Sequence, residues 1–306
     1  MPMCPNCGSW VSEGSSTWSC GTPMGGYSYV DWELEDKKRD IKNLYYEVER
    51  LKEKGRLAET LEKYEEIRQI DDSDIPNDER SNGRVLHILS NLDIDIADLH
   101  FELGEYEKAL ELYSSNRSFS YENRRKAAQC MIKLEIYDDA IDELKELIEH
   151  IKGVHIMSFD DWYSNDEKDY ERYVRVQKSW YRLLARLLNE LGEAYFRDGR
   201  PYEAISCYED GIGFDHDYAR NWCCKAFVLE RLKRYVEALK FYGIALAIDE
   251  DDEFTLKNRK SCLESYATAY VTGNYDVKSE YLKEALKLIE DEEESMPIIW
   301  GYSGDY

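Results

Sequence analysis

The sequence repeats itself with a period of 34 residues. Residues 185–218 and 219–252 are consecutive segments of equal length, and small or apolar residues recur at equivalent positions in both. The matching pairs are Ala185 and Ala219, Ala204 and Ala238, Tyr208 and Tyr242, and Ile212 and Leu246. A period of this length is typical of a supersecondary unit whose copies stack on one another.

Each segment is predicted to form two antiparallel helices. In the first segment Leu188, Leu191 and Tyr195 recur at helical spacing, and Ala204 and Tyr208 continue that spacing after the polar break "RDGRP". One such pair cannot cover its own apolar faces, so neighbouring pairs must stack. The sequence therefore predicts an all-α fold, an α-solenoid of stacked antiparallel helix pairs.

The pattern resembles the tetratricopeptide repeat (TPR), in which an aromatic residue, Leu-Gly, Tyr, Ala and a second aromatic residue follow at set places. The matching residues are Leu188, Leu191, Gly192, Tyr195, Ala204 and Tyr208 in the first segment, and Trp222, Ala226, Leu229, Ala238, Tyr242 and Ala245 in the second. His216 and Glu250 stand where the family usually has proline, and Gly211 and Lys225 replace apolar residues. We expect looser packing at these joints.

Weaker copies extend the array in both directions. They lie at residues 54–64, 103–113, 134–144 and 272–286, so six units are predicted within a repeat domain of residues 41–290. Irregular inserts are expected at 71–84 and 153–165, a linker at 27–40, and an acidic and aromatic tail at 291–306. The second insert is interpreted as a surface loop or as a segment that plugs a groove or binds a partner, and the tail as a cap on the last repeat or a recognition segment.

The resemblance implies that the first helix of each pair lines a concave groove that binds an extended or helical peptide. Residues eleven apart return to nearly the same face of a helix, which places Arg186 with Arg197, and Arg220 with Arg231 in the next unit. Guanidinium groups bind carboxylates through two parallel hydrogen bonds, so this face suits a carboxylate-bearing peptide. The alternative is local charge balance, for example between Arg197 and Glu193 one turn earlier. The predicted groove residues are Arg186, Asn189, Glu193, Arg197, Arg220, Phe227, Glu230 and Arg231.

A lysine and asparagine clamp for a terminal carboxylate, a known device of this family, is not visible in the sequence. The nearest imitation is Arg125 with Gln129.

The first 26 residues resemble a degenerate zinc ribbon. Cys4 and Cys7 form one Cys-x-x-Cys-Gly knuckle and Cys20 ends a second, but Thr17 occupies the place of the fourth ligand. Structural zinc is almost always held by four Cys or His ligands. Three interpretations stay open: a ribbon without metal, one zinc held by the three cysteines and another group, or thiols shared across a dimer.

Composition limits the function. The net charge of −24 repels phosphate backbones, so general nucleic-acid binding is not expected. The sequence contains neither an apolar run long enough to cross a bilayer nor a secretory leader, so a cytoplasmic location is predicted. Five further cysteines lie in helical patterns and are expected to be buried free thiols.

No motif for catalysis is visible, so a non-enzymatic function is predicted. The leading interpretation is a protein-interaction scaffold that binds a peptide or protein partner in the concave groove. The alternative is a zinc-dependent nucleic-acid-binding or translation-associated factor that uses the N-terminal ribbon.

Overall fold

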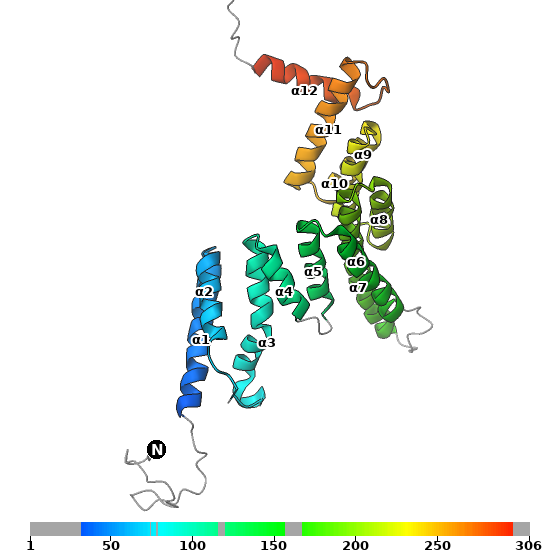
Figure 1. The fold of residues 1–306 in the computed structure, drawn as a ribbon. Coiled ribbons are helices and arrows are strands. Elements are labelled where there is room, and N and C mark those ends of the chain that lie inside the picture. Colours follow the sequence, from blue (N-terminus) through cyan, green and yellow to red (C-terminus); the bar gives the residue numbers. More distant parts are fainter. Residues whose placement is uncertain (1–31, 74, 78, 116–119, 157–166, 296–306) are drawn as a thin grey trace, which may run out of the picture. The chain divides into compact units, whose positions relative to one another are not determined.

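The computed structural model describes residues 32–73, 75–77, 79–115, 120–156 and 167–295. Over these residues it contains twelve α helices and no strand (Figure 1). The prediction of an all-α fold built from helix pairs is confirmed for this part of the chain. The ribbon-like segment 1–26, most of the insert 153–165 and the end of the tail lie outside the described residues. Contacts divide the chain into two compact units, Met1–Asn116 and Arg117–Tyr306.

Unit 1 consists of two helix pairs. They are α1 (Trp32–Lys52) with α2 (Leu57–Arg68), and α3 (Glu79–Glu102) with α4 (Tyr106–Ser115). Helix α1 begins inside the segment 27–40 for which a linker was expected. The reason is that Leu34, Ile41 and Val48 are spaced by seven residues, two helical turns, and so form one apolar stripe against the core. Helix α3 likewise begins within the expected insert 71–84.

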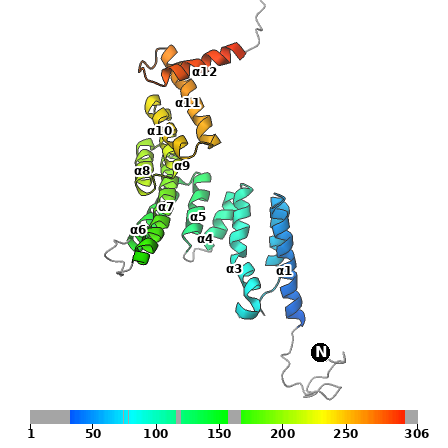
Figure 2. The same cartoon turned by 180° about the vertical axis from the view of Figure 1, so that it is seen from behind.

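Unit 2 consists of four helix pairs. These are α5 (Tyr121–Lys133) with α6 (Tyr137–His155), α7 (Glu167–Arg197) with α8 (Pro201–Phe214), α9 (Ala219–Arg231) with α10 (Tyr235–Ile248), and α11 (Glu253–Val271) with α12 (Leu282–Ser295). Each helix packs against the next, and α5, α7, α9 and α11 also contact one another in sequence (Figures 1 and 2). The first helices of the pairs therefore form one layer. None of the described helices is long and apolar enough to cross a membrane.

The same turn ends the first helix of each of the six described pairs. Each has one residue with positive φ shortly after the first helix, with the next residue's N–H bonded five residues back. In the turn between α7 and α8, for example, Gly199 has a φ of 79° and Arg200 donates to the Tyr195 carbonyl at 2.8 Å. This is the Schellman ending of a helix. The positive-φ residues are Gly55, Gly104, Glu135, Gly199, Lys233 and Gly273.

Gly211 and Lys225 depart from the family pattern, and the structure is closely packed around both. Gly211 on α8 lies against the amide of Asn221 on α9. The Lys225 side chain is only 12% exposed and its Nζ contacts a Glu209 carboxylate oxygen at 2.8 Å. It also lies 4.1 Å from the centre of the Phe241 ring. Polar side chains thus occupy these joints, contrary to the expectation of looser packing.

The five cysteines of the helical body are free thiols, as expected, and four of them are buried: Cys130, Cys207, Cys223 and Cys262. Burial raises the pKa of Cys223 to about 11 and that of Cys207 to about 12. They are therefore thiols rather than reactive thiolates at neutral pH.

Candidate functional site

The predicted groove residues belong to α7 and α9, which are neighbours in the layer of first helices. The helical period places Arg220 and Arg231 on nearly the same face of α9, and Arg186 and Arg197 on the corresponding face of α7. The surroundings of these four arginines differ, and the differences decide which of them is available to a ligand.

Two of the arginines rest on aromatic rings. The Arg220 guanidinium lies 4.7 Å from the ring centre of Phe254 on α11, and that of Arg231 lies 4.9 Å from the ring centre of Phe227. Both arginines are exposed, and neither forms an ion pair with any residue that the structure describes. A guanidinium that lies over a ring still has N–H groups that it can donate to an acceptor.

The other two arginines are already close to carboxylates. Arg197 donates to Glu193 at 2.9 Å, one turn earlier on the same helix. Arg186 is half-buried, and its positive charge favours the ionised forms of the nearby Glu122 and Glu190, although it is a minor influence on each. Local pairing, the second interpretation of the arginine pattern, thus describes Arg197 but not Arg220 or Arg231.

Two predicted groove residues point into the helix layer instead. Asn189 is buried and its amide donates to Asn221 Oδ1 at 2.9 Å, which joins α7 to α9. Glu230 accepts a hydrogen bond from Tyr242 Oη at 2.9 Å, and burial raises the pKa of its carboxyl. Both residues therefore serve the packing between helices.

Phe227 is half-buried and joins two aromatic contacts. Its ring meets that of Phe196 on α7 edge to face, with the centres 5.6 Å apart, and it supports the Arg231 guanidinium. The structure thus brings together Phe196, Phe227 and Arg231 as one continuous contact across α7 and α9.

The pair Arg125 and Gln129, on α5, holds a carboxylate of the chain itself. Arg125 Nη1 and Gln129 Nε2 both donate to Oε1 of Glu190, the second bond at 2.7 Å. Arg125 also pairs with Glu122. Glu190 Oε2 is buried without a partner among the described residues, and burial outweighs these donors and raises the pKa of Glu190 to about 7. This pair is therefore already occupied and is not free to clamp a ligand.

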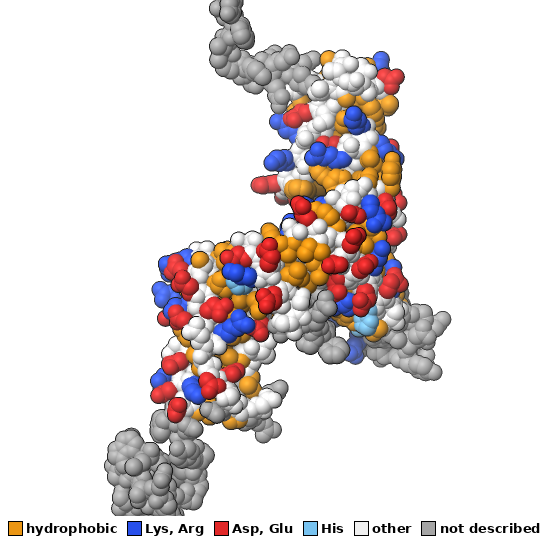
Figure 3. Space-filling model, viewed as in Figure 1, with side chains coloured by type: hydrophobic (Ala, Val, Ile, Leu, Met, Phe, Trp, Pro, Cys, Tyr) orange, Lys and Arg blue, Asp and Glu red, His pale blue; other side chains and the backbone are white. Residues whose placement is uncertain are grey.

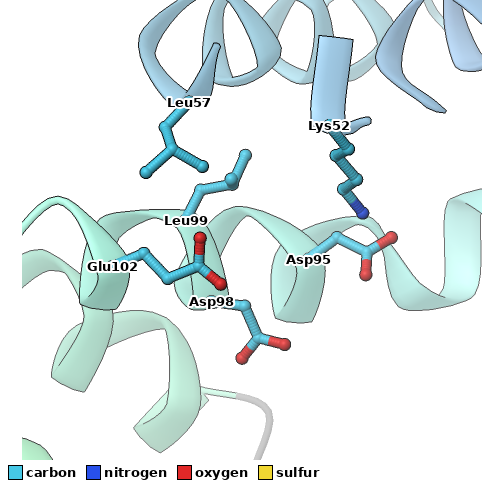
Figure 4. Close-up of a pocket in the computed structure, with 6 residues that line it drawn as sticks. All are labelled: Lys52, Leu57, Asp95, Asp98, Leu99 and Glu102. Carbon is cyan, nitrogen blue, oxygen red and sulfur yellow. The ribbon is translucent and has the colours of Figure 1, made fainter. Parts of the chain in front are cut away.

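Unit 1 contains a separate hollow of about 290 Å³ on α1, α2 and α3 (Figure 4). Lys52 donates to Tyr64 Oη at 2.7 Å, and Tyr64 donates to Asp95 at 3.0 Å. Tyr113 donates to Asp98. Two of the three carboxylates that line the hollow, those of Asp95 and Asp98, thus accept hydrogen bonds from tyrosines of the chain itself. The lining residues are Lys52, Leu57, Asp95, Asp98, Leu99 and Glu102. The three acidic residues share one face of α3, because they are three and four residues apart.

Arg220 also borders a hollow of about 360 Å³ at the ends of α9 and α10. It is the only basic residue among those that line it, and one of the neighbouring carboxylates, that of Asp252, caps α11 through the Thr255 N–H at 3.1 Å. The remaining lining residues are Asp217, Tyr218, Ala219, Ile248 and Asp249.

On the face seen in Figure 3, acidic and basic side chains alternate with apolar ones on both units, and no large patch of one sign is visible there. Among the described residues no group of His, Cys, Asp or Glu could hold a metal ion. The candidate zinc ligands Cys4, Cys7 and Cys20 lie outside the described residues.

Comparison with known proteins supports the repeat fold. Residues 89–147, from within α3 to within α6, match the model of the family described as anaphase-promoting complex, cyclosome, subunit 3, which is TPR-like. No curated protein matches the sequence. The family match, the helix pairs and their repeated turns together support a repeat protein of the tetratricopeptide kind.

Several solved structures are similar to the chain at low sequence identity. PilF of Pseudomonas aeruginosa is 12% identical with a TM-score of 0.48, and the match covers 85% of this chain and 95% of that chain. A thermophilic TPR protein of Thermus thermophilus is 17% identical with a TM-score of 0.42, covering 73% and 98%. YrrB, described as a TPR protein with an unusual peptide-binding site, is 15% identical with a TM-score of 0.42, covering 69% and 92%. At these values the likeness does not extend to a shared function.

Proposed function

We propose that the protein is a non-enzymatic interaction scaffold that binds an acidic peptide segment of a partner protein on the α7 and α9 face of unit 2. The observation that carries this proposal is the state of Arg220 and Arg231. Each is exposed, rests on a phenyl ring and is without an ion pair among the described residues. In a chain with a net charge of −24, carboxylates for local pairing are abundant, so two unpaired guanidiniums on one helix are available to a partner.

The physical basis is a charged contact beside an apolar one. A hydrogen bond to a charged group contributes about 1.5 to 3 kcal/mol. Stacking on Phe254 and Phe227 limits the positions of the two arginines, which reduces the side-chain entropy lost on binding. The half-buried rings of Phe196 and Phe227 offer apolar area between them. A partner that supplies both carboxylates and apolar side chains matches this surface.

Charge reversal tests the proposal. The variant Arg220→Glu/Arg231→Glu is compared with wild type and with Arg200→Glu/Arg234→Glu in a pull-down from cell extract, followed by titration of the captured partner over a salt series. Arg200 and Arg234 are matched controls, because both are paired with nearby glutamates, Glu203 and Glu237. We expect the first variant alone to lose its partner, with unchanged helical content by circular dichroism. If it retains every partner of the wild type, the proposal is overturned.

The alternative function, a zinc-dependent nucleic-acid-binding or translation-associated factor, depends on residues 1–26, outside the described part of the chain. Zinc binding by Cys4, Cys7 and Cys20 therefore stays a prediction, as does the cytoplasmic location. Metal analysis of the purified protein tests the zinc prediction directly.

A further inference from the structure

The two ring-supported arginines stand at opposite ends of a single helix, α9. Arg220 and Arg231 are eleven residues apart, so the rise of an ideal helix separates them by about 16 to 17 Å along its axis, with about 20° of rotation between them. Because both belong to one helix, the separation of their α-carbons does not depend on how the repeats bend against one another, and each guanidinium lies within one side-chain length of its own end of the helix.

The face between the two arginines is apolar. Residues 220, 224, 227 and 231 follow the spacing of a single helical stripe, which reads Arg220, Cys224, Phe227 and Arg231 along α9. Cys224 and Phe227 are both half-buried. The stripe thus presents a positive charge at each end and a partly exposed apolar centre.

We infer that this stripe binds an amphipathic helix of the partner that carries acidic residues at positions i and i+11 and apolar residues at i+4 and i+7. The inference rests on the proposed function and specifies its ligand. A ligand helix parallel or antiparallel to α9 has the same rise and the same phase, so its two carboxylates meet both guanidiniums while its apolar pair meets Cys224 and Phe227.

An extended ligand fits the same stripe less well. Five extended residues also span about 16 to 17 Å, but side chains five apart on a strand point to opposite faces. Two side chains that are four or six residues apart on a strand lie on the same face, but their separation differs from 16 to 17 Å by about 3 Å. The distance between the two arginines and their common face together therefore favour a helical ligand over an extended one.

Three synthetic helices of about 20 residues, each stapled because short helices are marginal in water, test the inference on the full chain. All carry two glutamates in an otherwise uncharged background with the same apolar pair. The first places the glutamates at i and i+11. The second places them at i and i+7, on the same face but only about 10 Å apart, and the third at i and i+9, on opposite faces and about 13 to 14 Å apart. Fluorescence anisotropy gives each dissociation constant.

The i, i+11 helix should bind about tenfold more tightly than either control, since each control loses one of two charge-assisted contacts. Arg231→Ala should abolish this preference, whereas Arg234→Ala should preserve it. Equal binding of all three helices, or a preference that survives Arg231→Ala, overturns the inference and leaves the proposed function standing. Failure of every acidic helix, together with partner capture by Arg220→Glu/Arg231→Glu, overturns both.

Discussion

The side-chain amide of Asn221 fills the space in which a β-carbon at position 211 would lie. A β-carbon there would be 2.4 Å from Asn221 Nδ2 and 3.3 Å from the Ala185 carbonyl oxygen. The same amide donates to that carbonyl at 3.1 Å and accepts from Asn189 at 2.9 Å. A glycine on α8 thus makes possible a buried polar bridge between α7 and α9.

Replacing Gly211 by alanine should destabilise unit 2, because the added methyl group displaces Asn221 and its hydrogen bonds. We expect a loss of about 1 to 3 kcal/mol in the free energy of unfolding, measured by urea denaturation. Gly213→Ala is the matched control on the same helix. Nothing lies near its β-carbon, so alanine there should be neutral or stabilising by up to about 1 kcal/mol. Equal effects of the two substitutions would contradict the bridge.

Glu135→Gly should stabilise the protein. Glu135 closes the turn between α5 and α6 with a φ of 62°, a left-handed conformation that costs a residue with a β-carbon about 1 to 2 kcal/mol. Part of this gain is lost because glycine is more flexible in the unfolded chain, so the net increase should be at most about 1 kcal/mol. Thermal unfolding measures it, and Glu135→Ala, which keeps the β-carbon, should show no such gain.

The buried carboxyl of Glu190 should make stability depend on pH. Its pKa of about 7 in the folded protein lies above the ordinary value of about 4.3, so the folded state holds this proton more tightly than the unfolded state. The corresponding stability is fully present below about pH 4 and is lost as the pH rises to about 7. Glu190→Gln removes this dependence.

The melting temperature of Glu190→Gln should therefore rise relative to that of the wild type between pH 5 and pH 8. A difference between the two proteins that stays constant over this range would show that Glu190 is ionised throughout, with Arg125 as its permanent counter-charge.

Arg231→Ala should weaken partner binding more than Arg197→Ala. Arg197 already donates to Glu193, so a partner carboxylate must compete with an existing contact, whereas Arg231 rests on the ring of Phe227 and forms no ion pair with a described residue. Titration of the captured partner at low salt should show about a tenfold loss for Arg231→Ala and a smaller one for Arg197→Ala. The reverse order would place the binding surface on α7.

The helix pairs could be predicted because the residues that specify each pair lie close together in the sequence. The break "RDGRP" and the apolar spacing around it lie within one unit, and α7 and α8 follow from them. The partner of Glu190 was not predictable in this way, since Arg125 is 65 residues away on α5. The only signal in the sequence was a lone acidic residue inside the apolar run of Leu187, Leu188 and Leu191.

The departures from the family pattern could be seen in the sequence, but the contacts that the substituted residues make could not. Gly211 and Lys225 appeared as missing apolar residues, and only the three-dimensional neighbours Asn221 and Phe241 show what replaced the lost contacts. The early start of α1 was missed for another reason. The charged run "ELEDKKRD" obscures an apolar stripe whose members, Leu34 and Ile41, are seven residues apart.

In five of the six described helix pairs, the reversal between the two helices is set by about six consecutive residues around one left-handed position. A gene segment that encodes a whole helix pair also encodes the residues that form its turn. Duplication or deletion of such a segment therefore leaves the turns of the neighbouring pairs intact. Lengthening or shortening of the protein by one helix pair at a time is therefore compatible with an intact α9.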